Sequence, residues 1–403
     1  MPGAATEESG ETWYLHGLEG RRRPPRERPG GRKMFHVAYA ITITMWKSSI
    51  WSSSALSDGA AVLAHSIATT QNSESYTLDL IAILGQNATA GRGPLTAMGY
   101  RVLIGTTPVL QHEITPGYYR DSYESAGCCG SSELLKLRAY QLIEYDRVLV
   151  LDTDAVLLQS IEHLFTRSMR ANLSLVYTND HSLDNPGSAA PPVQAGFLLV
   201  APSRRVYTDM LAIIRKGDFR PGTGWGGQKI GWCWGGRTVQ GLLPYYYHRV
   251  APPNASLAID NCRYNGMANE PRNCSSVAFS SVYTAHFTLC QKPWVCIQHT
   301  LRLCRRMHHA WWAARASLLA AHGREEVPAA RECERGAGSY PPLPNFFSAW
   351  PRPKRWAEQQ ATARRGRGAP AAVLPRGRAG AGAAGPTDGS SRGHGAYAAR
   401  RVR

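Results

Sequence analysis

The amino-acid sequence predicts an α/β fold in which a mostly parallel, Rossmann-like sheet carries helices on both faces. Segments with the apolar pattern of strands alternate with segments of helical spacing, and this alternation is typical of βαβ units. No internal repeat interrupts the order. The 403 residues, of which 43% are hydrophobic, are enough to bury one large core or two small ones. Crossovers between parallel strands are expected to be right-handed.

The elements are predicted in order from apolar spacing and turn signals. Strands are expected at 34–44, 76–84, 100–104, 147–152 and 193–203. Helices are expected at 60–67, in a turn from Leu95, and at 132–145, 204–216 and 299–322. The segment 111–131 is expected to be a loop, and 242–247 a strand-like Leu-Pro segment. Ser131 or Ser132 is the candidate N-cap of the helix at 132–145.

The most informative motif is the end of the predicted strand at 147–152, where Asp152 and Asp154 stand two residues apart. Side chains alternate along a strand, so the two carboxylates are expected to point to one side and Thr153 to the other. Open α/β sheets bind ligands at the carboxyl ends of their strands, and paired carboxylates there suit a hard divalent cation. The alternative is a solvated turn after a strand.

Further candidate ligands lie before and after this motif. Lys136 belongs to the predicted helix that precedes it, and Gln194 and Ala195 enter a later apolar strand. His286 and Lys292 follow on a loop that a proline interrupts. Carboxylates, an imidazole and two ammonium groups together suit a metal-bound pyrophosphate. For Lys136 the alternative is an ordinary solvated helix lysine.

The order of these motifs resembles the family 8 glycosyltransferases, the glycogenin-like retaining enzymes. Lys136 lies sixteen residues before Asp152, as in that family. The family's closing motif, His-Phe-x-Gly-x-x-Lys-Pro-Trp, matches in spacing from His286 to Lys292 and in the Pro-Trp that follows. The resemblance covers residues 34–300. It implies a nucleotide-diphospho-sugar transferase fold (GT-A type) with a donor site at the end of the sheet.

The resemblance also implies a function, which is transfer of a hexose or related sugar from a UDP-sugar donor to a glycan or protein acceptor. Asp152, Asp154 and His286 are the implied ligands of Mn²⁺ or another divalent cation, which stabilises the charge that develops on the leaving diphosphate. Lys136 and Gln228 are the implied catalytic residues. The implied donor-binding residues are Ile43, Thr44, Lys136, Asp152, Thr153, Asp154, Gln194, Ala195, Gln228 and Lys292.

The chain departs from the family pattern at two places. Gly224 and Gly227 stand where family members carry carboxylates, and Lys229 stands where they have glycine. Leu289 replaces a glycine in the loop after the candidate histidine. Asp218 is a nearby candidate substitute. The alternative function is therefore a catalytically weak or inactive relative that binds nucleotide sugar or glycan, and the nucleophile and the mechanism of retention stay open.

The net charge of +17 lies mainly at the ends of the chain. Residues 351–403 carry 12 Lys and Arg against two Asp and Glu and predict a disordered basic tail, and 1–33 predicts a second disordered basic segment. Between them a glycosyltransferase domain is expected at 34–305 and a helical or irregular extension at 306–350. No zinc-finger spacing or aromatic–basic RNA motif accompanies the charge, so no nucleic-acid partner is expected.

Sequons and cysteines favour the secretory pathway, in the Golgi lumen, with the cytoplasm as the alternative. The four Asn-x-Ser/Thr sequons begin at Asn87, Asn172, Asn254 and Asn273. Among nine cysteines, Cys262 and Cys274 flank a short polar loop and predict a disulfide. No stretch reaches the ~18–20 apolar residues that span a bilayer. Membrane association is therefore expected only through a missing anchor or the basic tail, and the oligomeric state is open.

Overall fold

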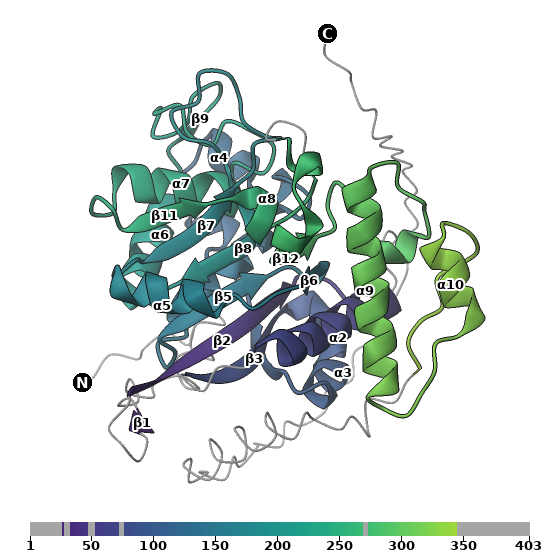
Figure 1. Ribbon diagram of the computed structural model, residues 1–403. Helices are drawn as coiled ribbons and strands as arrows, with labels where there is room; N and C mark the ends of the chain where they lie inside the picture. Colours follow the sequence, from purple (N-terminus) through teal and green to yellow (C-terminus); the bar gives the residue numbers. More distant parts are fainter. Residues whose placement is uncertain (1–25, 28–32, 47–52, 72–75, 269–272, 345–403) are drawn as a thin grey trace, which may run out of the picture. The chain divides into compact units, whose positions relative to one another are not determined.

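The computed structural model describes residues 26–27, 33–46, 53–71, 76–268 and 273–344, whose helices and strands are shown in Figure 1. The predicted basic tail at 351–403 and most of the predicted N-terminal segment at 1–33 lie outside these residues. Among the described helices, none combines the length and the apolar character that crossing a membrane requires.

One eight-stranded sheet organises the fold. Its strands in spatial order are β11 (Ser256–Ile259), β7 (Leu175–Asn179), β8 (Val193–Val200), β5 (Arg147–Leu151), β2 (Lys33–Ile43), β3 (Tyr76–Gly85) and β4 (Arg101–Gly105), with β1 (Arg26–Glu27) beside β2. β8 runs antiparallel to β5 and β7, and β1 runs antiparallel to β2. The other neighbouring pairs are parallel.

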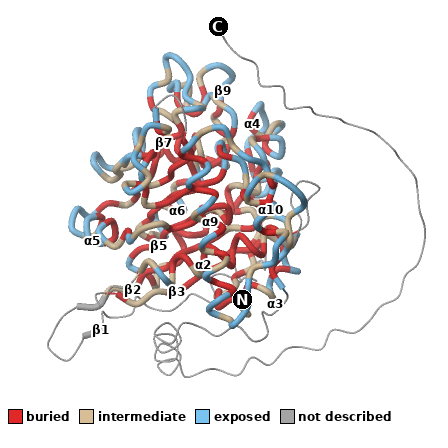
Figure 2. The backbone as a smooth tube through the Cα atoms, turned by 45° about the vertical axis from the view of Figure 1, so that its right-hand side comes forward, coloured by how far each residue is buried: buried red, intermediate tan, exposed pale blue. Residues whose placement is uncertain are grey.

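Side chains of the central strand alternate between two apolar layers. In β2, Val37, Tyr39 and Ile41 lie in one buried cluster, whereas Ala38 and Ala40 lie in the other. This period of two is the geometry of a strand, and burial on both faces explains why the strand is almost continuously apolar. Figure 2 shows the buried strands in the interior and the exposed loops around them.

Helices cover both faces, which confirms the predicted fold class, α/β with a mostly parallel sheet. The first face is covered by α2 (Ser53–Thr70), α3 (Arg92–Ala97), α5 (Glu162–Arg170), α9 (Arg302–Ala320) and α10 (Pro328–Glu334). The second is covered by α4 (Tyr118–Asp121), α6 (Arg204–Lys216), α7 (Val239–Arg249) and the 3₁₀ segment η4 (Gly130–Gln141). α9 packs on α2 and crosses the predicted domain boundary at residue 305.

Short elements complete the fold outside the main sheet. They are the paired strands β6 (Ala155–Leu157) and β12 (Thr284–His286), the paired strands β9 (Phe219–Arg220) and β10 (Gly224–Trp225), and the helix α8 (Asn261–Tyr264). 3₁₀ turns lie at η1 (Gln86–Gly91), η2 (Gln111–Glu113), η3 (Tyr123–Ser125), η6 (Cys274–Ser276), η7 (Phe279–Ser281) and η8 (Pro293–Val295). The predicted loop at 111–131 therefore contains η2, η3 and the short helix α4.

The α-helix predicted at 132–145 is wrong, because this stretch forms the 3₁₀ segment η4. Neither predicted cap is used, since Cys129 precedes the segment and makes no capping hydrogen bond. A 3₁₀ helix has three residues per turn, so side chains at i and i+3 lie in one row. Glu133 and Lys136 lie in such a row and form an ion pair at 3.2 Å.

The strand-like segment predicted at 242–247 is also wrong, because it belongs to the helix α7. Val239, Leu242, Leu243 and Tyr246 are buried on one side of this helix and pack in the second apolar cluster. Their spacing of three, four and seven residues is that of a helix face. Pro244 lies within this helix, so the resemblance to a Leu-Pro segment does not indicate a strand here.

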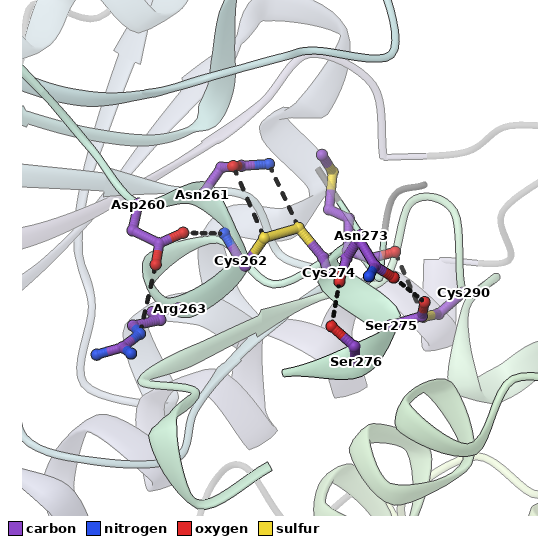
Figure 3. The surroundings of a disulfide bond; sticks show 10 residues. Asp260, Asn261, Cys262, Arg263, Asn273, Cys274, Ser275, Ser276 and Cys290 are labelled. Atoms are coloured by element: carbon purple, nitrogen blue, oxygen red, sulfur yellow. Dashed lines mark hydrogen bonds and ion pairs between the residues drawn. A yellow bond between two sulfur atoms is a disulfide. The ribbon is translucent and has the colours of Figure 1, made fainter. Parts of the chain in front are cut away.

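The predicted disulfide between Cys262 and Cys274 is confirmed. Figure 3 shows it beside the start of α8, where Asp260 accepts a hydrogen bond from Cys262 N at 3.0 Å and pairs with Arg263. Two further disulfides were not predicted. They join Cys290 to Cys304 and Cys296 to Cys333.

Candidate active site

The two candidate carboxylates lie on the turn between β5 and β6, at the carboxyl edge of the sheet. β5 ends at Leu151, and β6 begins at Ala155. β12 pairs antiparallel with β6 and sets His286 opposite Ala155. Phe287 N also donates to Asp154 O at 2.9 Å. This small ribbon therefore carries the candidate histidine to a turn that lies far from it in the sequence.

Asp152, Asp154 and His286 converge on one point. His286 Nε2 lies 3.4 Å from Asp154 Oδ1 and 3.8 Å from Asp152 Oδ2, and one ligand atom from each residue lies within 4.8 Å of the others. Ligand atoms that share an ion at ~2.1 Å lie roughly 3–4 Å apart, so these three fit a single divalent cation. Two carboxylates with one imidazole suit Mn²⁺ better than Ca²⁺.

The imidazole is held against β8. His286 is 2% exposed, and a Cβ at Gly196 would lie 2.4 Å from its Cε1. Thr288 Oγ1 lies 3.0 Å from its Nε2, whereas its buried Nδ1 has no hydrogen-bond partner among the described residues. Gln194 Oε1 accepts from Gly196 N at 2.7 Å. Gly196 therefore leaves room for the ring, and Gln194 holds the strand entrance in place.

Lys136 approaches the cluster from η4. Its buried ammonium lies 2.9 Å from Asp152 Oδ1 and 3.2 Å from Glu133 Oε2. Burial lowers the pKa of Lys136, but these two carboxylates outweigh it and raise the pKa above its ordinary value. The alternative of a solvated helix lysine is therefore wrong, and the group is a fixed cation rather than a base.

Lys292 approaches from the other side and pairs with Asp154 Oδ2. Burial raises the pKa of Asp154, but the Lys292 ammonium and the His286 imidazole outweigh it and hold that pKa well below its ordinary value. The disulfide cysteines Cys290 and Cys296 stand on either side of Lys292 in the sequence. Asp154 thus stays ionised beside the Lys292 ammonium, and the loop between Cys290 and Cys296 that carries Lys292 is anchored at both ends by disulfides.

The remaining predicted donor residues lie at the same sheet edge. Ile41 pairs in register with Leu151, so Ile43, which ends β2, and Thr44, which follows it, lie beside the turn that carries Asp152 and Asp154. Thr153 is buried, and a Cβ at Gly59 of α2 would lie 2.6 Å from its carbonyl oxygen. Ala195 is buried in β8, next to Gln194.

Gln228 is not brought into this cluster. It is exposed on the turn after β10, and its amide donates to Gly226 O at 3.4 Å. A Cβ at Gly224 would lie 2.0 Å from Ile230 O, so this backbone has no room for a carboxylate side chain there. Gly227 has a φ of +68°, which favours glycine. Asp218 pairs with Arg220 at 2.7 Å.

Asp180, a carboxylate that directly follows β7, was not predicted as a site residue. It is 4% exposed, accepts from Ser182, and accepts from Gln194 Nε2 at 3.2 Å. Gln194 thus links Asp180 to Gly196 and so to His286. The signal was a lone acidic residue after an apolar strand, the same context as Asp152 but without a second carboxylate.

The comparisons with known proteins give similar solved structures only. No protein-family model matches the sequence, and no curated protein matches it. The bifunctional glycosyltransferase WbbM aligns over 77% of this chain and 53% of its own at 12% identity and a TM-score of 0.44. Glycosyltransferase GlyE of Streptococcus pneumoniae aligns over 70% of this chain and 60% of its own at 13% identity and a TM-score of 0.40.

Mouse xyloside xylosyltransferase 1 aligns over 62% of this chain and 96% of its own, at 14% identity and a TM-score of 0.37. The chain therefore spans only about half of WbbM and three fifths of GlyE. The strand order and directions of the main sheet show the fold class.

Proposed function

We propose that the protein is a metal-dependent, retaining glycosyltransferase of the family 8 type. It would move a hexose or related sugar from a UDP-sugar to a glycan or protein acceptor. The observation that carries the proposal is the convergence of Asp152, Asp154 and His286, flanked by the ammonium groups of Lys136 and Lys292. Three candidate ligands for a cation, flanked by two ammonium groups, suit a diphosphate such as that of a UDP-sugar.

Each charged residue has a role in this mechanism. Asp152, Asp154 and His286 would hold Mn²⁺ or a similar cation, which when bound neutralises the charge that develops on the leaving diphosphate. Lys292, beside Asp154, is placed to donate to a pyrophosphate oxygen. Lys136, held by Asp152, keeps its proton and adds positive charge on the opposite side.

The donor sugar would lie between the cation site and β8. Gln194 and Asp180 offer an amide and a buried carboxylate to its hydroxyl groups, and Ala195 lies next to them. The uridine would lie at the end of β2, near Ile43 and Thr44. Gln228 would reach the anomeric face only if its turn closed over the donor, because its side chain is exposed.

The second candidate function is a non-catalytic relative that binds nucleotide sugar or glycan. The observation in its favour is the backbone at Gly224, which excludes the carboxylate side chain that family members carry there. A binding protein needs neither that carboxylate nor a nucleophile. It would still bind UDP with a divalent cation.

We also propose that the protein works in the secretory lumen, such as the Golgi. Six of its nine cysteines form disulfides, and disulfides persist in oxidising compartments. All four sequon asparagines are exposed, so their side chains are open to glycosylation; they are Asn87, Asn172, Asn254 and Asn273. A shift in mass on treatment of the secreted protein with an endoglycosidase would test this, and an unchanged mass would contradict it.

The proposed activity is tested by donor hydrolysis. The full chain is incubated with UDP-glucose, UDP-galactose, UDP-xylose or UDP-glucuronate, with Mn²⁺ or with EDTA, and released UDP is measured. We expect Mn²⁺-dependent release from one donor. Asp154→Asn keeps the side-chain volume but removes a charged ligand, so release should fall at least about 100-fold.

Asp121→Asn is the matched control, because Asp121 is an exposed carboxylate on α4; its rate should equal that of the wild type. A second outcome is that the folded wild type releases no UDP from any donor and yet binds UDP with Mn²⁺. That result would contradict the transferase function and support the binding function. UDP release that persists in EDTA would contradict the cation's role.

A further inference from the structure

A pocket of about 440 Å³ lies outside the metal cluster, which is the group of Asp152, Asp154 and His286. Four segments line it, namely α4, the loop after Asp180, β9, and the stretch that follows β10. α4 and β9 pack together here, and Figure 1 shows them near one another at the top of the view. Nothing in the mechanism above uses this pocket.

Aromatic rings dominate its wall and are left open to solvent. Trp234 is 49% exposed, Tyr118 is 42% exposed and Trp232 is 39% exposed. Trp232 packs against Tyr118 and Phe219, with ring centroids 6.3 and 6.0 Å apart. Large rings usually bury most of their surface, and a cluster of exposed apolar side chains marks a binding site.

Polar groups of both signs stand among these rings. Asp184 and Arg237 line the pocket, and the Arg237 guanidinium lies 6.0 Å from the centre of the Tyr118 ring. Asn185 donates to Trp232 O and so ties the loop to the tryptophan. Flat rings with a carboxylate, an amide and a guanidinium suit a neutral ligand that has C–H faces and many hydroxyl groups.

The pocket is joined to the metal cluster by direct contacts. Asp180 accepts from Ser182, which lines the pocket, and from Gln194. Gln194 in turn holds Gly196, against which the His286 ring lies. Burial raises the pKa of Cys233, another lining residue, to about 12, and the carboxylate of Asp180 adds to this effect. Asp180 thus links Ser182 of the pocket to Gln194, which holds Gly196 beside His286.

We propose that this aromatic pocket binds the terminal pyranose of a neutral glycan. The pyranose C–H face would stack on Trp234 and Trp232, whose ring faces are negative, and its hydroxyl groups would bond Asp184 and Arg237. Given the transferase function proposed above, on which this step rests, that glycan is the acceptor. Its free hydroxyl would then point past Asp180 to the donor sugar.

The test is saturation-transfer NMR on the full chain without any UDP-sugar. The probes are methyl β-D-glucopyranoside, methyl β-D-galactopyranoside, methyl β-D-xylopyranoside and lactose at millimolar concentration. We expect saturation of at least one probe, and affinity about tenfold lower in Trp234→Ala. Trp234→Phe should keep part of the affinity that Trp234→Ala loses. The control is Val327→Ala, at an exposed apolar residue outside the pocket, and it should bind the probe like the wild type.

Asp154→Asn separates this proposal from the proposed function. Binding that survives in Asp154→Asn but is lost in Trp234→Ala supports the pocket, even if no donor is hydrolysed. No saturation of any probe by the folded wild type overturns it. The proposal is also overturned if Trp234→Ala binds the probe as tightly as the wild type, or if only Asp154→Asn loses binding. Both outcomes count whether or not UDP is released.

Discussion

The position of the candidate histidine, His286, depends on the absence of a side chain at Gly196. Gly196 has its Cα close to the His286 ring, and a Cβ there would also lie 2.8 Å from Nδ1. Real Cβ atoms do not approach other atoms this closely. Gly196 therefore allows His286 of β12 to lie close against β8, beside Asp152 and Asp154.

Gly196→Ala should weaken Mn²⁺ binding by about 10-fold to 100-fold, because the added methyl pushes the imidazole away from the carboxylates. Isothermal titration with Mn²⁺ measures the effect. Gly93→Ala is the matched control, since nothing lies within 4 Å of its added Cβ; it should bind Mn²⁺ normally. Equal affinities in the two variants would show that the His286 ring is not held by this contact.

At the residue scale, sequence motifs predicted the three side chains that converge at the end of β5, but not the residues that support them. Asp152, Asp154 and His286 were found because each belongs to a spaced motif. Glu133 and Asp180 were missed because a single acidic residue has no spacing to recognise. Only the folded chain shows that one holds Lys136 and the other holds Gln194.

At the element scale, α2 is bound to the segment after α10 through a buried carboxylate. Asp58 is 2% exposed and accepts from Tyr340 Oη at 2.5 Å and from Leu343 N at 2.7 Å. Arg315 and Glu326 pair with each other. The charge of Arg315 lowers the pKa of Asp58, and the charge of Glu326 raises it. Burial raises the pKa of Asp58 to about 6, although both hydrogen bonds and Arg315 oppose this.

This buried carboxylate should make stability depend on pH. The pKa of Asp58 is about 6 in the fold and lower in the unfolded chain, so the fold binds more protons and its stability rises as pH falls from 7.5 to 5. The expected gain is about 1.4 kcal/mol. Asp58→Asn keeps an acceptor oxygen and should lose this gain.

Urea unfolding of both proteins at pH 5 and pH 7.5 measures it. The unfolding free energy of Asp58→Asn minus that of the wild type should be higher at pH 7.5 than at pH 5, because only the wild type gains stability as pH falls. The same difference in unfolding free energy at both pH values would show that Asp58 does not titrate in this range.

Helices whose ends carry capping residues were predicted well. A buried element whose candidate caps are not used was not. The predicted helix at 204–216 matches α6 because Ser203 caps its start and Gly217, with a φ of 65°, ends it. For η4 the candidate caps Ser131 and Ser132 are not used, and most of its side chains are buried, charged Lys136 and Arg138 included. Apolar periodicity distinguishes a helix type only when one side faces water.

At the scale of the whole molecule, two unpredicted disulfides bind the lysine loop to the C-terminal helices. Cys290 is joined to Cys304 of α9, and Cys296 is joined to Cys333 of α10. Cysteine spacing alone does not reveal partners, so the sequence could not show this. Lys292 lies between these two anchor points.

Replacing Cys296 and Cys333 together by serine should lower the free energy of unfolding by about 3–4 kcal/mol, because the closed loop of 37 residues restricts the unfolded chain. Urea unfolding without reductant measures it. The matched control replaces Cys128 and Cys129, which are exposed and free, and should change stability by under about 0.5 kcal/mol. Equal losses in the two double variants would contradict the anchoring role of the disulfide.

The antiparallel pairing of β6 with β12 has a consequence for biosynthesis. Lys292 follows Asp154 by 138 residues, so a ribosome that adds about 5–20 residues per second makes it roughly 7–28 s later. The strands from β2 to β5 can pair during that time, while the two aspartates still lack their histidine and lysine. The proposed cation site is therefore incomplete until His286 and Lys292 have been synthesised and β12 has paired with β6.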